Sequence, residues 1–483
     1  MPGITLLGLG PGDPQLMTRQ AWEVLQSCRE LYLRTSHHPV VTSLPDSIQI
    51  HAFDSLFESG LSIEMVCFQI VEQVLALGQR PQGVVYAVPG HPYVAEDTSP
   101  EIARRAQALG ISVRVVEGLS FLEPTFTALG LTPFPHTAVV DALTLAAGHM
   151  PPFPTSAPAI IAQLHSRVLA TQIKKALMSL YPGEHNVQLV HAAGTPQVMV
   201  ELLALQDIDR SERIAATTSL YLPPLGPTTS FEAFLEIIAH LRAPDGCPWD
   251  REQTHQTLRT HLLEETYEVL AALDENDSQA LREEFGDLLL QVVLHAQIAS
   301  EYGEFNMAEI LHSIHTKIVS RHPHVFGDLE VKDAQGVLRN WERLKAEERA
   351  ANGKAEASLL DGVGSTLPAL LQAEQYQRRA AHVGFDWPDV QGVLDKLEEE
   401  LQEVHAARDG FERYNEIGDL LFAVVNLARW YKIEPESALR EANRRFRLRF
   451  GYIERQAREQ GRAITDLSLD EMEALWQAAK RQV

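Results

Sequence analysis

The sequence predicts a multidomain protein in which a two-lobed α/β part precedes an all-α part built from helical bundles. In the first half, short apolar or β-branched runs alternate with helical stretches and with Gly- and Pro-rich connections, as in α/β folds. In the second half, long segments rich in Leu, Glu, Ala and Gln carry apolar residues at helical spacing. The segment 223–227, Pro-Pro-Leu-Gly-Pro, separates the two patterns, so we expect the first part to cover residues 1–226.

The first half is expected to start with a strand that runs into a glycine-rich turn. The strands expected in this half are 4–7, 83–88, 113–116, 159–162, 187–191 and 219–222, and the helices are 19–28 and 100–109. The proline-rich segment 151–158 can continue neither a helix nor a central strand. We therefore expect the joint between the two lobes near 151–158.

Composition limits the functional classes. The 483 residues predict two to four domains, with a net charge of −24. Residues 1–230 carry 12 basic and 19 acidic side chains (−7), and the rest carry 29 and 46 (−17). This acidity argues against nucleic acid as a partner. We also expect no membrane-spanning helix, because no apolar run is long enough.

The start of the chain and its cysteines favour a cytoplasmic protein. The first residues, Met-Pro-Gly-Ile-Thr-Leu, lack the basic and apolar regions of a secretory signal. The three cysteines, Cys28, Cys67 and Cys247, are scattered and have no CxxC spacing. They argue against a disulfide framework and against a thiolate zinc site.

The helical half contains an internal repeat. Residues 261–269 align with 396–404, and residues 284–289 align with 416–421. The offsets are 135 (268 to 403) and 132 (287 to 419). A period of this size corresponds to a whole domain rather than to a solenoid unit. We expect two related helical domains, 232–355 (copy one) and 360–483 (copy two).

Each copy has one helix with Glu-Glu-x-x-Glu and a later helix with Glu-x-x-Asp. Acids three residues apart share one face of a helix, so two antiparallel helices would bring several carboxylates together. A hard cation, Mg²⁺ or alternatively Mn²⁺, would relieve their repulsion. The alternative is a solvated acidic face, but both motifs recur in both copies. The candidate ligands are Glu265, Glu268, Glu284 and Asp287 in copy one and Glu400, Glu403, Glu416 and Asp419 in copy two.

Basic residues follow the acids in each copy. Arg445 and Arg449 lie four residues apart on a predicted helix, as do Lys317 and Arg321. Such pairs can face one bound anion, although an ordinary basic helix face remains an alternative. A cation site combined with guanidinium groups is typical of phosphoryl chemistry.

Residues 240–483 resemble the MazG family of nucleoside triphosphate pyrophosphohydrolases in its tandem form. The matching motifs are Cys-Pro-Trp-Asp-Arg-Glu-Gln-Thr-His at 247–255, Arg-His-Pro-His-Val-Phe-Gly at 321–327 and Asn-Trp-Glu-Arg-Leu-Lys at 340–345. The resemblance implies an all-α homodimer that converts nucleoside triphosphates to monophosphates and pyrophosphate with Mg²⁺.

The same resemblance implies roles for individual residues. Glu399, Glu400 and Glu403 would be the catalytic acids of copy two, which is the copy expected to be active. The implied substrate contacts are Arg445, Arg449 and Trp476 in copy two and Lys317 and Arg321 in copy one. Where the family often has Lys, this chain has Arg445, which preserves the charge but not the geometry.

The N-terminal turn places Gly8, Gly10 and Gly12 at alternate positions. It matches neither the dinucleotide fingerprint nor a Walker loop. From the residues alone, the glycines indicate close approach either to a ligand or to a neighbouring strand.

Residues 1–224 resemble the tetrapyrrole (corrin/porphyrin) methylase family. The resemblance rests on the turn 8–14, on Val-Glu-Gly-Leu-Ser-Phe at 116–121 and on the closing segment 217–224. It implies two lobes with S-adenosylmethionine between them, bound at Gly8, Gly10, Gly12, Asp13 and Gly90. Where the family has Gly-Asp-Pro, this chain has Gly90-His91-Pro92, which weighs against methyl transfer to a tetrapyrrole. The fusion of the two families is a known arrangement, the YabN type.

Three functional hypotheses follow. The first is a Mg²⁺-dependent nucleoside triphosphate pyrophosphohydrolase for nucleotide pool housekeeping, with an accessory N-terminal part. The second is an S-adenosylmethionine-dependent methyltransferase. The third is a scaffold that senses nucleotide or cofactor without catalysis. The preferred base of the nucleotide cannot be inferred from the residues.

Overall fold

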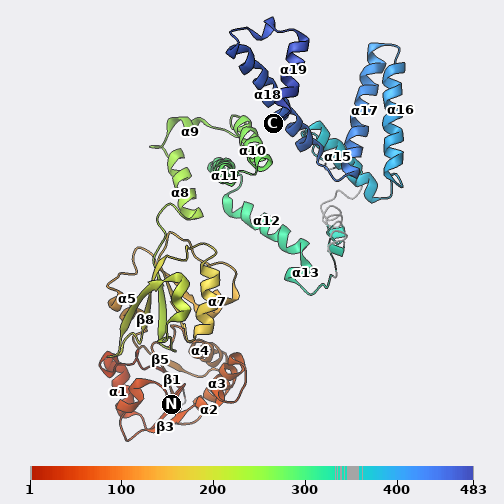
Figure 1. Cartoon of the computed structure of the whole chain (residues 1–483). Helices are drawn as coiled ribbons and strands as arrows, with labels where there is room; N and C mark the ends of the chain where they lie inside the picture. The colour runs from red at the N-terminus through yellow and green to blue at the C-terminus, as the bar shows by residue number, and fades with distance from the viewer. Residues whose placement is uncertain are drawn as a thin grey trace. The chain divides into compact units, whose positions relative to one another are not determined.

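The computed structural model describes residues 3–331, 333, 336, 337, 340, 341, 343, 344, 358–361 and 363–481. The chain forms two compact units, Met1–Cys247 and Pro248–Val483. The first is an α/β unit with two sheets, and the second is helical throughout the part that the structure describes (Figure 1). The predicted fold class is confirmed.

The first lobe is a parallel sheet with helices on both faces. Its five strands run in the order β3-β2-β4-β1-β5. The elements are β1 (Ile4–Gly8), η1 (Pro14–Leu16), α1 (Arg19–Ser27), β2 (Glu30–Leu33), η2 (Pro39–Ser43), β3 (Gln49–Ala52), α2 (Asp54–Phe57), α3 (Ile63–Gly78), β4 (Val84–Val88), α4 (Thr98–Ala108) and β5 (Val113–Val116). Leu6 packs with residues of α3 and α4, whereas its neighbour Leu7 packs with residues of α1. The continuous apolar run of β1 therefore reflects a strand that is buried on both faces.

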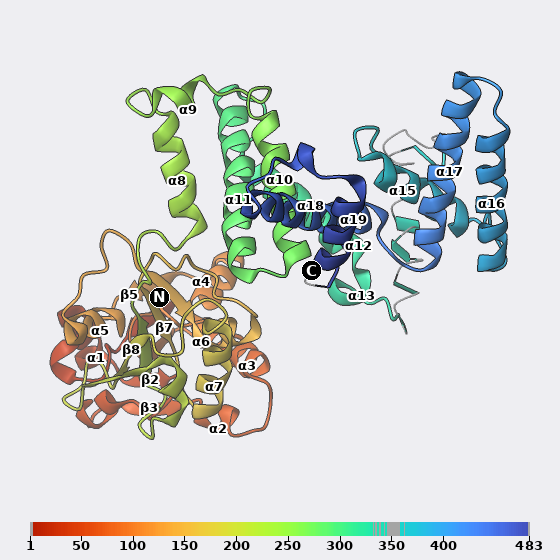
Figure 2. The same cartoon turned by 45° about the horizontal axis from the view of Figure 1, so that its top comes forward.

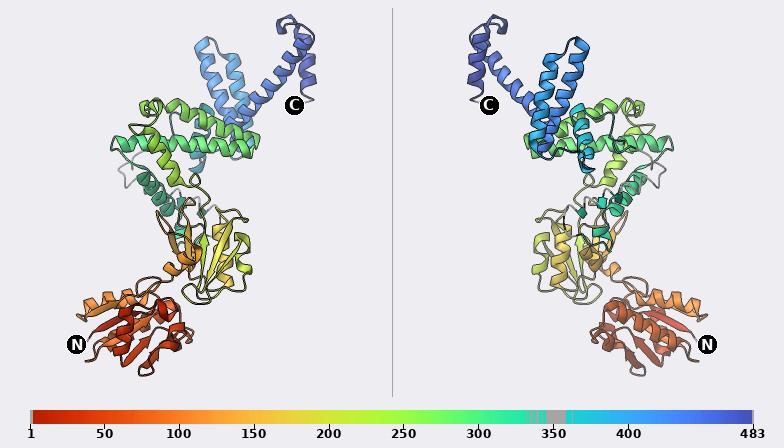
Figure 3. Two further views of the ribbon diagram at one scale, coloured as in Figure 1. Left: turned by 90° about the vertical axis from the view of Figure 1, so that its left-hand side faces the viewer. Right: turned by 90° about the vertical axis from the view of Figure 1, so that its right-hand side faces the viewer.

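The second lobe is a mixed sheet in the order β6-β7-β10-β8-β9. Strands β6 and β7 pair in parallel, and the other neighbours pair antiparallel. The elements are α5 (Leu122–Leu129), β6 (Ala138–Asp141), α6 (Ala142–Ala147), β7 (Ala159–Ala162), α7 (Arg167–Leu177), β8 (Asn186–His191), β9 (Met199–Ala204), η3 (Leu205–Arg210) and β10 (Thr218–Leu222). Figure 3 shows the two lobes as separate bodies, one red to orange and the other yellow to green.

The predicted lobe joint near 151–158 is corrected by this topology. Strand β6 already belongs to the second sheet, where Ala138 pairs with Ala159. The proline-rich segment therefore connects two elements of the same lobe, and the Ala138 amide donates to the Pro158 carbonyl (2.9 Å). The chain passes between the lobes earlier, between β5 and β6. The prolines correctly indicate that 151–158 is neither helix nor central strand. They do not show to which sheet the strands before and after the segment belong.

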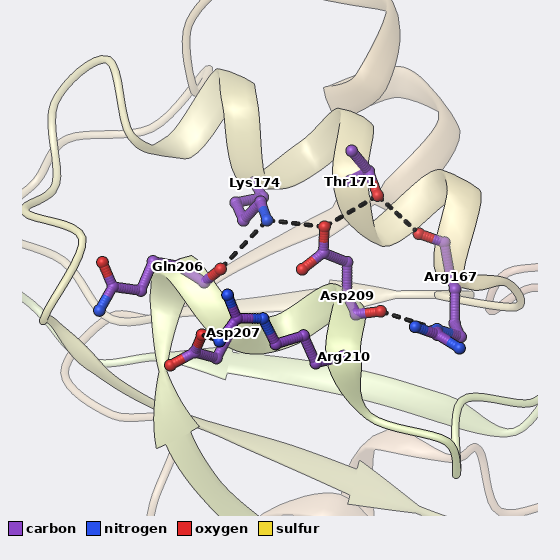
Figure 4. Close-up of polar contacts among 7 residues, drawn as sticks. All are labelled: Arg167, Thr171, Lys174, Gln206, Asp207, Asp209 and Arg210. Atoms are coloured by element: carbon purple, nitrogen blue, oxygen red, sulfur yellow. Dashed lines mark hydrogen bonds and ion pairs between the residues drawn. The ribbon is translucent and has the colours of Figure 1, made fainter.

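A polar clamp holds η3 against α7 in the second lobe (Figure 4). The Lys174 ammonium contacts the Asp209 carboxylate (2.6 Å) and donates to the Gln206 carbonyl (3.1 Å). Thr171 also donates to the Asp209 carboxylate, at 3.0 Å. Burial alone would raise the pKa of Asp209, but the hydrogen bonds from Lys174 and Thr171 hold it below its usual value.

Helix α8 (Phe231–Arg242) is grouped with the first unit, although the sequence analysis assigned it to the helical part. The segment before it is hydrogen-bonded to the second lobe. Thr155 donates to the Thr229 carbonyl (2.6 Å), and the Ser156 and Ser230 hydroxyls are 2.7 Å apart. These contacts anchor the start of α8.

The second unit contains two helical hairpins of similar build. Its first elements are α9 (Pro248–Glu252), α10 (Arg259–Glu275), α11 (Ser278–Glu301), α12 (Met307–Arg321) and α13 (Pro323–Phe326). After the segment 345–357, which lies outside the described residues, come α15 (Ala369–His382), α16 (Val390–Ala406), α17 (Gly410–Trp430), α18 (Pro435–Glu459), η4 (Ile464–Asp466) and α19 (Leu469–Ala479). Figure 2 shows α10 beside α11 and α16 beside α17. No described helix has an apolar stretch long enough to cross a bilayer.

Candidate metal centre and glycine-loop site

In copy two, short connections fold the acidic helices back on one another. Asp389 caps the start of α16 by accepting from the amides of Gln391 and Gly392. Asp409 caps α17 in the same way, three residues after α16 ends at Ala406. So short a connection makes the two helices antiparallel neighbours. The predicted antiparallel pairing of the two acidic motifs is therefore present.

Carboxylates from both helices meet in this hairpin. One oxygen from each of Glu400, Glu416 and Asp419 lies within 4.8 Å of the others. The fourth predicted ligand, Glu403, is near enough that its charge affects Glu416. Burial, followed by the charges of Glu403, Asp419 and Glu400, raises the pKa of Glu416. Three of the four predicted acids of copy two therefore converge, and the fourth, Glu403, lies outside the 4.8 Å group but close enough to act on Glu416.

Glu400 is the buried member of this group. Its residue is 5% exposed, and its Oε2 atom is buried without a hydrogen-bond partner. A buried carboxylate oxygen that lacks a partner is costly. The acids supply only oxygen ligands, which suit a hard divalent cation such as Mg²⁺. The donor set and the unpartnered oxygen both fit this ion.

Copy one repeats the arrangement between α10 and α11. Oxygens of Glu265, Glu268 and Glu284 lie within 4.8 Å of one another. Partial burial and the charge of Asp287, followed by that of Glu268, raise the pKa of Glu265. The pKa of Glu284 is also raised, by burial and then by the charges of Glu268 and Asp287. Three of the four predicted acids of copy one therefore converge, and the charge of the fourth, Asp287, acts on two of them.

Glu399, the remaining predicted catalytic acid, lies beside the carboxylate group rather than in it. Its Oε1 atom is 3.0 Å from the Lys396 ammonium, and its side chain is exposed. The same ammonium is 2.8 Å from Oε1 of Glu400. Lys396 thus links the outer acid to the buried ligand candidate.

The predicted phosphate contacts of copy two form a second group, on α18 and α19. Arg445 pairs with Glu441 on its own helix at 3.1 Å. The Arg449 guanidinium lies over the Trp476 ring, 5.8 Å from its centroid, and its Nε atom is buried without a partner. Phe446 packs against the same ring. A guanidinium stacked on an indole is held rigidly, with donors left for an anion.

Copy one contains the same cation–aromatic pair. The Arg321 guanidinium lies 5.6 Å from the centroid of the Trp341 ring. Trp341 belongs to the motif at 340–345 but was assigned no role, although it lies 135 residues before Trp476, which is the period of the repeat. Lys317 is exposed on α12. Glu342 and Lys345 of the motif at 340–345 lie outside the described residues.

In the first unit, the predicted glycines meet at the carboxyl edge of the parallel sheet. Gly10 and Gly90 form a two-way backbone bridge, with N···O distances of 3.1 and 2.8 Å. From β1 the chain continues to β2, on one side of β1 in the sheet, and from β4 it continues to β5, on the opposite side of β1. The loops after β1 and β4 therefore leave in opposite directions. Ligands of open α/β sheets bind at such a switch point.

The individual glycines have different reasons for lacking a side chain. A Cβ on Gly8 would lie 2.6 Å from the Gly118 amide and from the Gly90 carbonyl, so neighbouring loops fill that space. A Cβ on Gly12 would meet Thr195 of the second lobe at 2.7 Å. Beside Gly90, by contrast, nothing lies nearer than 3.9 Å. Close approach of backbone therefore explains Gly8, whereas Gly90 could hold a Cβ at ordinary contact distances and is explained by its φ of +68°.

Asp13 acts locally as a cap. Its carboxylate accepts from the Gln15 amide (2.9 Å), and its own amide donates to the Gly194 carbonyl (2.8 Å). The loop thereby joins the two lobes.

Two histidines lie at the same edge of the sheet. The His91 Nδ1 atom accepts from the Tyr93 amide (3.0 Å), the turn contact that an aspartate at this position could also make. His38 is 9% exposed, and both of its ring nitrogens are buried without partners. Burial lowers the pKa of His38 to about 4, although the nearby Gly10 backbone acts in the opposite direction. His38 was not among the predicted site residues, because no sequence motif marks it.

Comparisons with known proteins match both parts of the chain. The family model for the MazG nucleotide pyrophosphohydrolase domain matches residues 253–326, and the model for tetrapyrrole (corrin/porphyrin) methylases matches residues 3–209. The protein YabN of Bacillus subtilis (strain 168) is 41% identical over 486 residues, which cover 99% of this chain and 98% of YabN.

A second relative covers half of the chain. The nucleoside triphosphate pyrophosphohydrolase/pyrophosphatase MazG of Thermotoga maritima is 43% identical over 250 residues, which cover 52% of this chain and 95% of that protein. Among solved structures, uroporphyrin-III-C-methyltransferase of Thermus thermophilus aligns with 46% of this chain and 94% of its own, at 23% identity and a TM-score of 0.37. The chain belongs to the MazG family, with a tetrapyrrole methylase domain preceding its MazG part.

Proposed function

We propose that the helical unit hydrolyses nucleoside triphosphates, or their deoxy forms, to the monophosphate and pyrophosphate. The observation that carries this proposal is the convergence of Glu400, Glu416 and Asp419 between α16 and α17, with a buried, unpartnered oxygen on Glu400. The similarity to the Thermotoga enzyme named for this reaction supports it. The role we propose in the cell is nucleotide pool housekeeping in the cytoplasm, and the three free cysteines fit a reducing compartment.

In this proposal, Glu400, Glu403, Glu416 and Asp419 hold Mg²⁺, or Mn²⁺ in its place. The ion would neutralise phosphate charge and polarise the attacked phosphorus. Arg445 and Arg449 bind the phosphate chain, and Trp476 offers a ring face to the substrate. A carboxylate among Glu399, Glu400 and Glu403 accepts the proton of the attacking water. Copy two is the principal site, and Lys317, Arg321 and the acids of copy one form a second site of the same kind.

We also propose that the working form is a homodimer. Large apolar side chains on the acidic hairpins remain exposed, among them Leu263 (57%), Phe285 (50%) and Leu421 (53%). Exposed apolar residues on several helices are typical of surfaces that a partner covers. A sedimentation experiment that finds only monomer at micromolar concentration would contradict this part.

The decisive assay measures pyrophosphate release from common and modified nucleoside triphosphates, with and without Mg²⁺. Glu403→Ala and Asp419→Ala are expected to abolish release. Glu398→Ala, an exposed residue of the same helix, is the matched control and should keep the rate of the unmodified chain. Full activity of a Glu403→Ala chain in which Glu268→Ala also disables copy one would refute the proposal.

A second candidate function is S-adenosylmethionine binding by the first unit. The meeting of the Gly10 and Gly90 loops at the switch point of the sheet favours it, and so do the unpartnered nitrogens of His38. The expected contacts are Gly10 and Gly90, with Gly8, Gly12 and Asp13 shaping the loop. Calorimetry on the full chain tests it, and an absence of heat with both S-adenosylmethionine and S-adenosylhomocysteine would exclude it.

A further inference from the structure

Copy two contains a cation of its own at the acidic group. The Lys396 ammonium lies 2.8 Å from Glu400 and 3.0 Å from Glu399. The Glu400 side chain is 6% exposed, whereas that of Lys396 is 37% exposed. The lysine therefore reaches from the surface toward a buried carboxylate that we have assigned to the metal.

The matching position in copy one has no such contact. The repeat offset of 135 places His261 at the position of Lys396. The His261 ring contacts Glu264 at 3.3 Å, which is the equivalent of Glu399 and not of Glu400. Among the described residues, no Lys or Arg contacts Glu265 in the way that Lys396 contacts Glu400. The two copies thus have the same four acids but different compensation of their charge.

Helix stability alone does not account for the lysine. A lysine four residues before a glutamate is the less favourable order for an intrahelical pair, and exposed pairs of this kind contribute little. The ammonium stabilises the buried Glu400 carboxylate more than it stabilises the helix, because an ionised group out of contact with water needs a counter-charge. Lys396 supplies that charge at Oε1 of Glu400, the carboxylate whose other oxygen, Oε2, is left without a partner.

We propose that Lys396 is a competing internal cation that keeps the metal affinity of copy two below that of copy one. This inference rests on the proposed function, since it concerns the same acids. In the metal-free protein the ammonium neutralises Glu400. A divalent ion that binds there must displace the ammonium or tolerate its repulsion. In copy one, whose described residues hold no such ammonium, the ion binds without this opposition.

The expected effect follows from the charges. A unit positive charge about 6 Å from a divalent cation, screened as in water, changes its affinity by about tenfold. Removing the lysine charge should therefore tighten metal binding at copy two. If Lys396 instead only positioned Glu400 as a ligand, removing it would weaken binding. The two roles therefore predict opposite changes in the metal affinity of copy two.

The test is a Mn²⁺ titration of the full chain, followed by electron paramagnetic resonance at about pH 8, where the carboxyls are ionised. Copy one is first disabled by Glu265→Gln and Glu268→Gln. In this background, Lys396→Met should bind Mn²⁺ about tenfold more tightly than the parent, and Lys396→Arg should bind like the parent. Equal or weaker binding by the Met variant overturns the inference.

A reciprocal variant covers the case in which Lys396→Met fails to fold. With copy two disabled by Glu400→Gln and Glu416→Gln, His261→Lys should weaken Mn²⁺ binding at copy one, and unchanged or tighter binding would overturn the inference. Metal-dependent pyrophosphate release by the unmodified chain separates the two proposals. If release requires Mg²⁺ while Lys396→Met and its parent bind Mn²⁺ equally, only the role of Lys396 fails. If neither release nor Mn²⁺ binding occurs, both fail.

Discussion

Glu400 differs from the other candidate ligands in its surroundings. Of the eight acids, all of which the structure describes, it alone is buried. Its exposed neighbour Glu399 shares the contact with Lys396 but is not part of the carboxylate group. Two adjacent glutamates of one motif therefore face different environments.

This difference predicts different metal affinities for two matched variants. In a chain with copy one disabled, Glu400→Gln should weaken Mn²⁺ binding by about 100-fold, because a ligand is lost at the centre of the group. Glu399→Gln should change it by no more than about threefold, since a surface charge contributes little. The measurement is the same Mn²⁺ titration. Similar losses in both variants would place Glu399 among the ligands.

At the scale of elements, the loops after β1, β4 and β5 pack backbone against backbone. A Cβ on Gly8 would collide with the loops that carry Gly90 and Gly118, whereas a Cβ on Gly90 would make only ordinary contacts, and Gly90 has a φ of +68°. The first glycine is required by packing and the second by its backbone conformation.

We expect Gly8→Ala and Gly90→Ala to behave differently. The methyl group on residue 8 would press on two backbones and cost about 1–3 kcal/mol of unfolding free energy. Gly90→Ala should cost only the strain of a left-handed alanine, about 1–2 kcal/mol, and should also weaken binding of S-adenosylmethionine by placing a methyl group in the proposed site. Denaturant unfolding and calorimetry measure the two effects. Equal cofactor affinity in Gly90→Ala and the parent would remove Gly90 from the proposed site.

The clamp between η3 and α7 offers a second test at this scale. Lys174→Met leaves the Asp209 carboxylate with Thr171 as its side-chain donor, and we expect a loss of about 1–3 kcal/mol. Lys175→Met, on an exposed position of the same helix, is the control and should be nearly neutral. Because the pKa of Asp209 is depressed in the folded state, the stabilisation is present above its ordinary pKa of 3.8 and is lost as the pH falls through the folded value. An unfolding series that shows equal stability for both variants would contradict the assigned role of the clamp.

At the scale of the whole molecule, the charge of −24 now has a structural location. The helical part carries most of it, and the two acidic groups hold carboxyls whose pKa is raised, namely Glu265, Glu284 and Glu416. In each case burial acts together with neighbouring carboxylates. In the metal-free protein, repulsion between these carboxylates therefore opposes the folding of the two hairpins.

The pH dependence of stability follows from the sign of these shifts. A raised carboxyl pKa means that the folded state binds protons more tightly than the unfolded chain. Metal-free stability of the helical unit should thus decline as the pH rises above about 4.5, the ordinary glutamate value, until the raised folded pKa is passed. Mg²⁺ should restore stability most at the higher pH. Thermal unfolding in chelator and in Mg²⁺ checks both, and a Mg²⁺ effect that is equal at low and neutral pH would argue against the carboxylates as its site.

Much of this architecture could be predicted from local sequence. The strand at 159–162 and the helix near 19–28 were recognisable because buried strands and amphipathic helices have their own periods. The two acid motifs were also recognisable, because a duplicated domain repeats its functional residues at one spacing. The pairing of Trp341 with Arg321 was present in the same repeat but was not recognised.

What the sequence by itself determined was the division into an α/β part and a duplicated helical part, together with the residue types of each acidic group. Only the tertiary structure decided the strand order β3-β2-β4-β1-β5, the true lobe joint and the contact of Gly8 with distant backbone. It also decided that Glu400 is buried beside Lys396, while no Lys or Arg among the residues that the structure describes contacts Glu265 in this way. The reason is physical: periodicity and turn chemistry act between neighbours in the chain, whereas burial and charge compensation depend on packing between segments far apart in sequence.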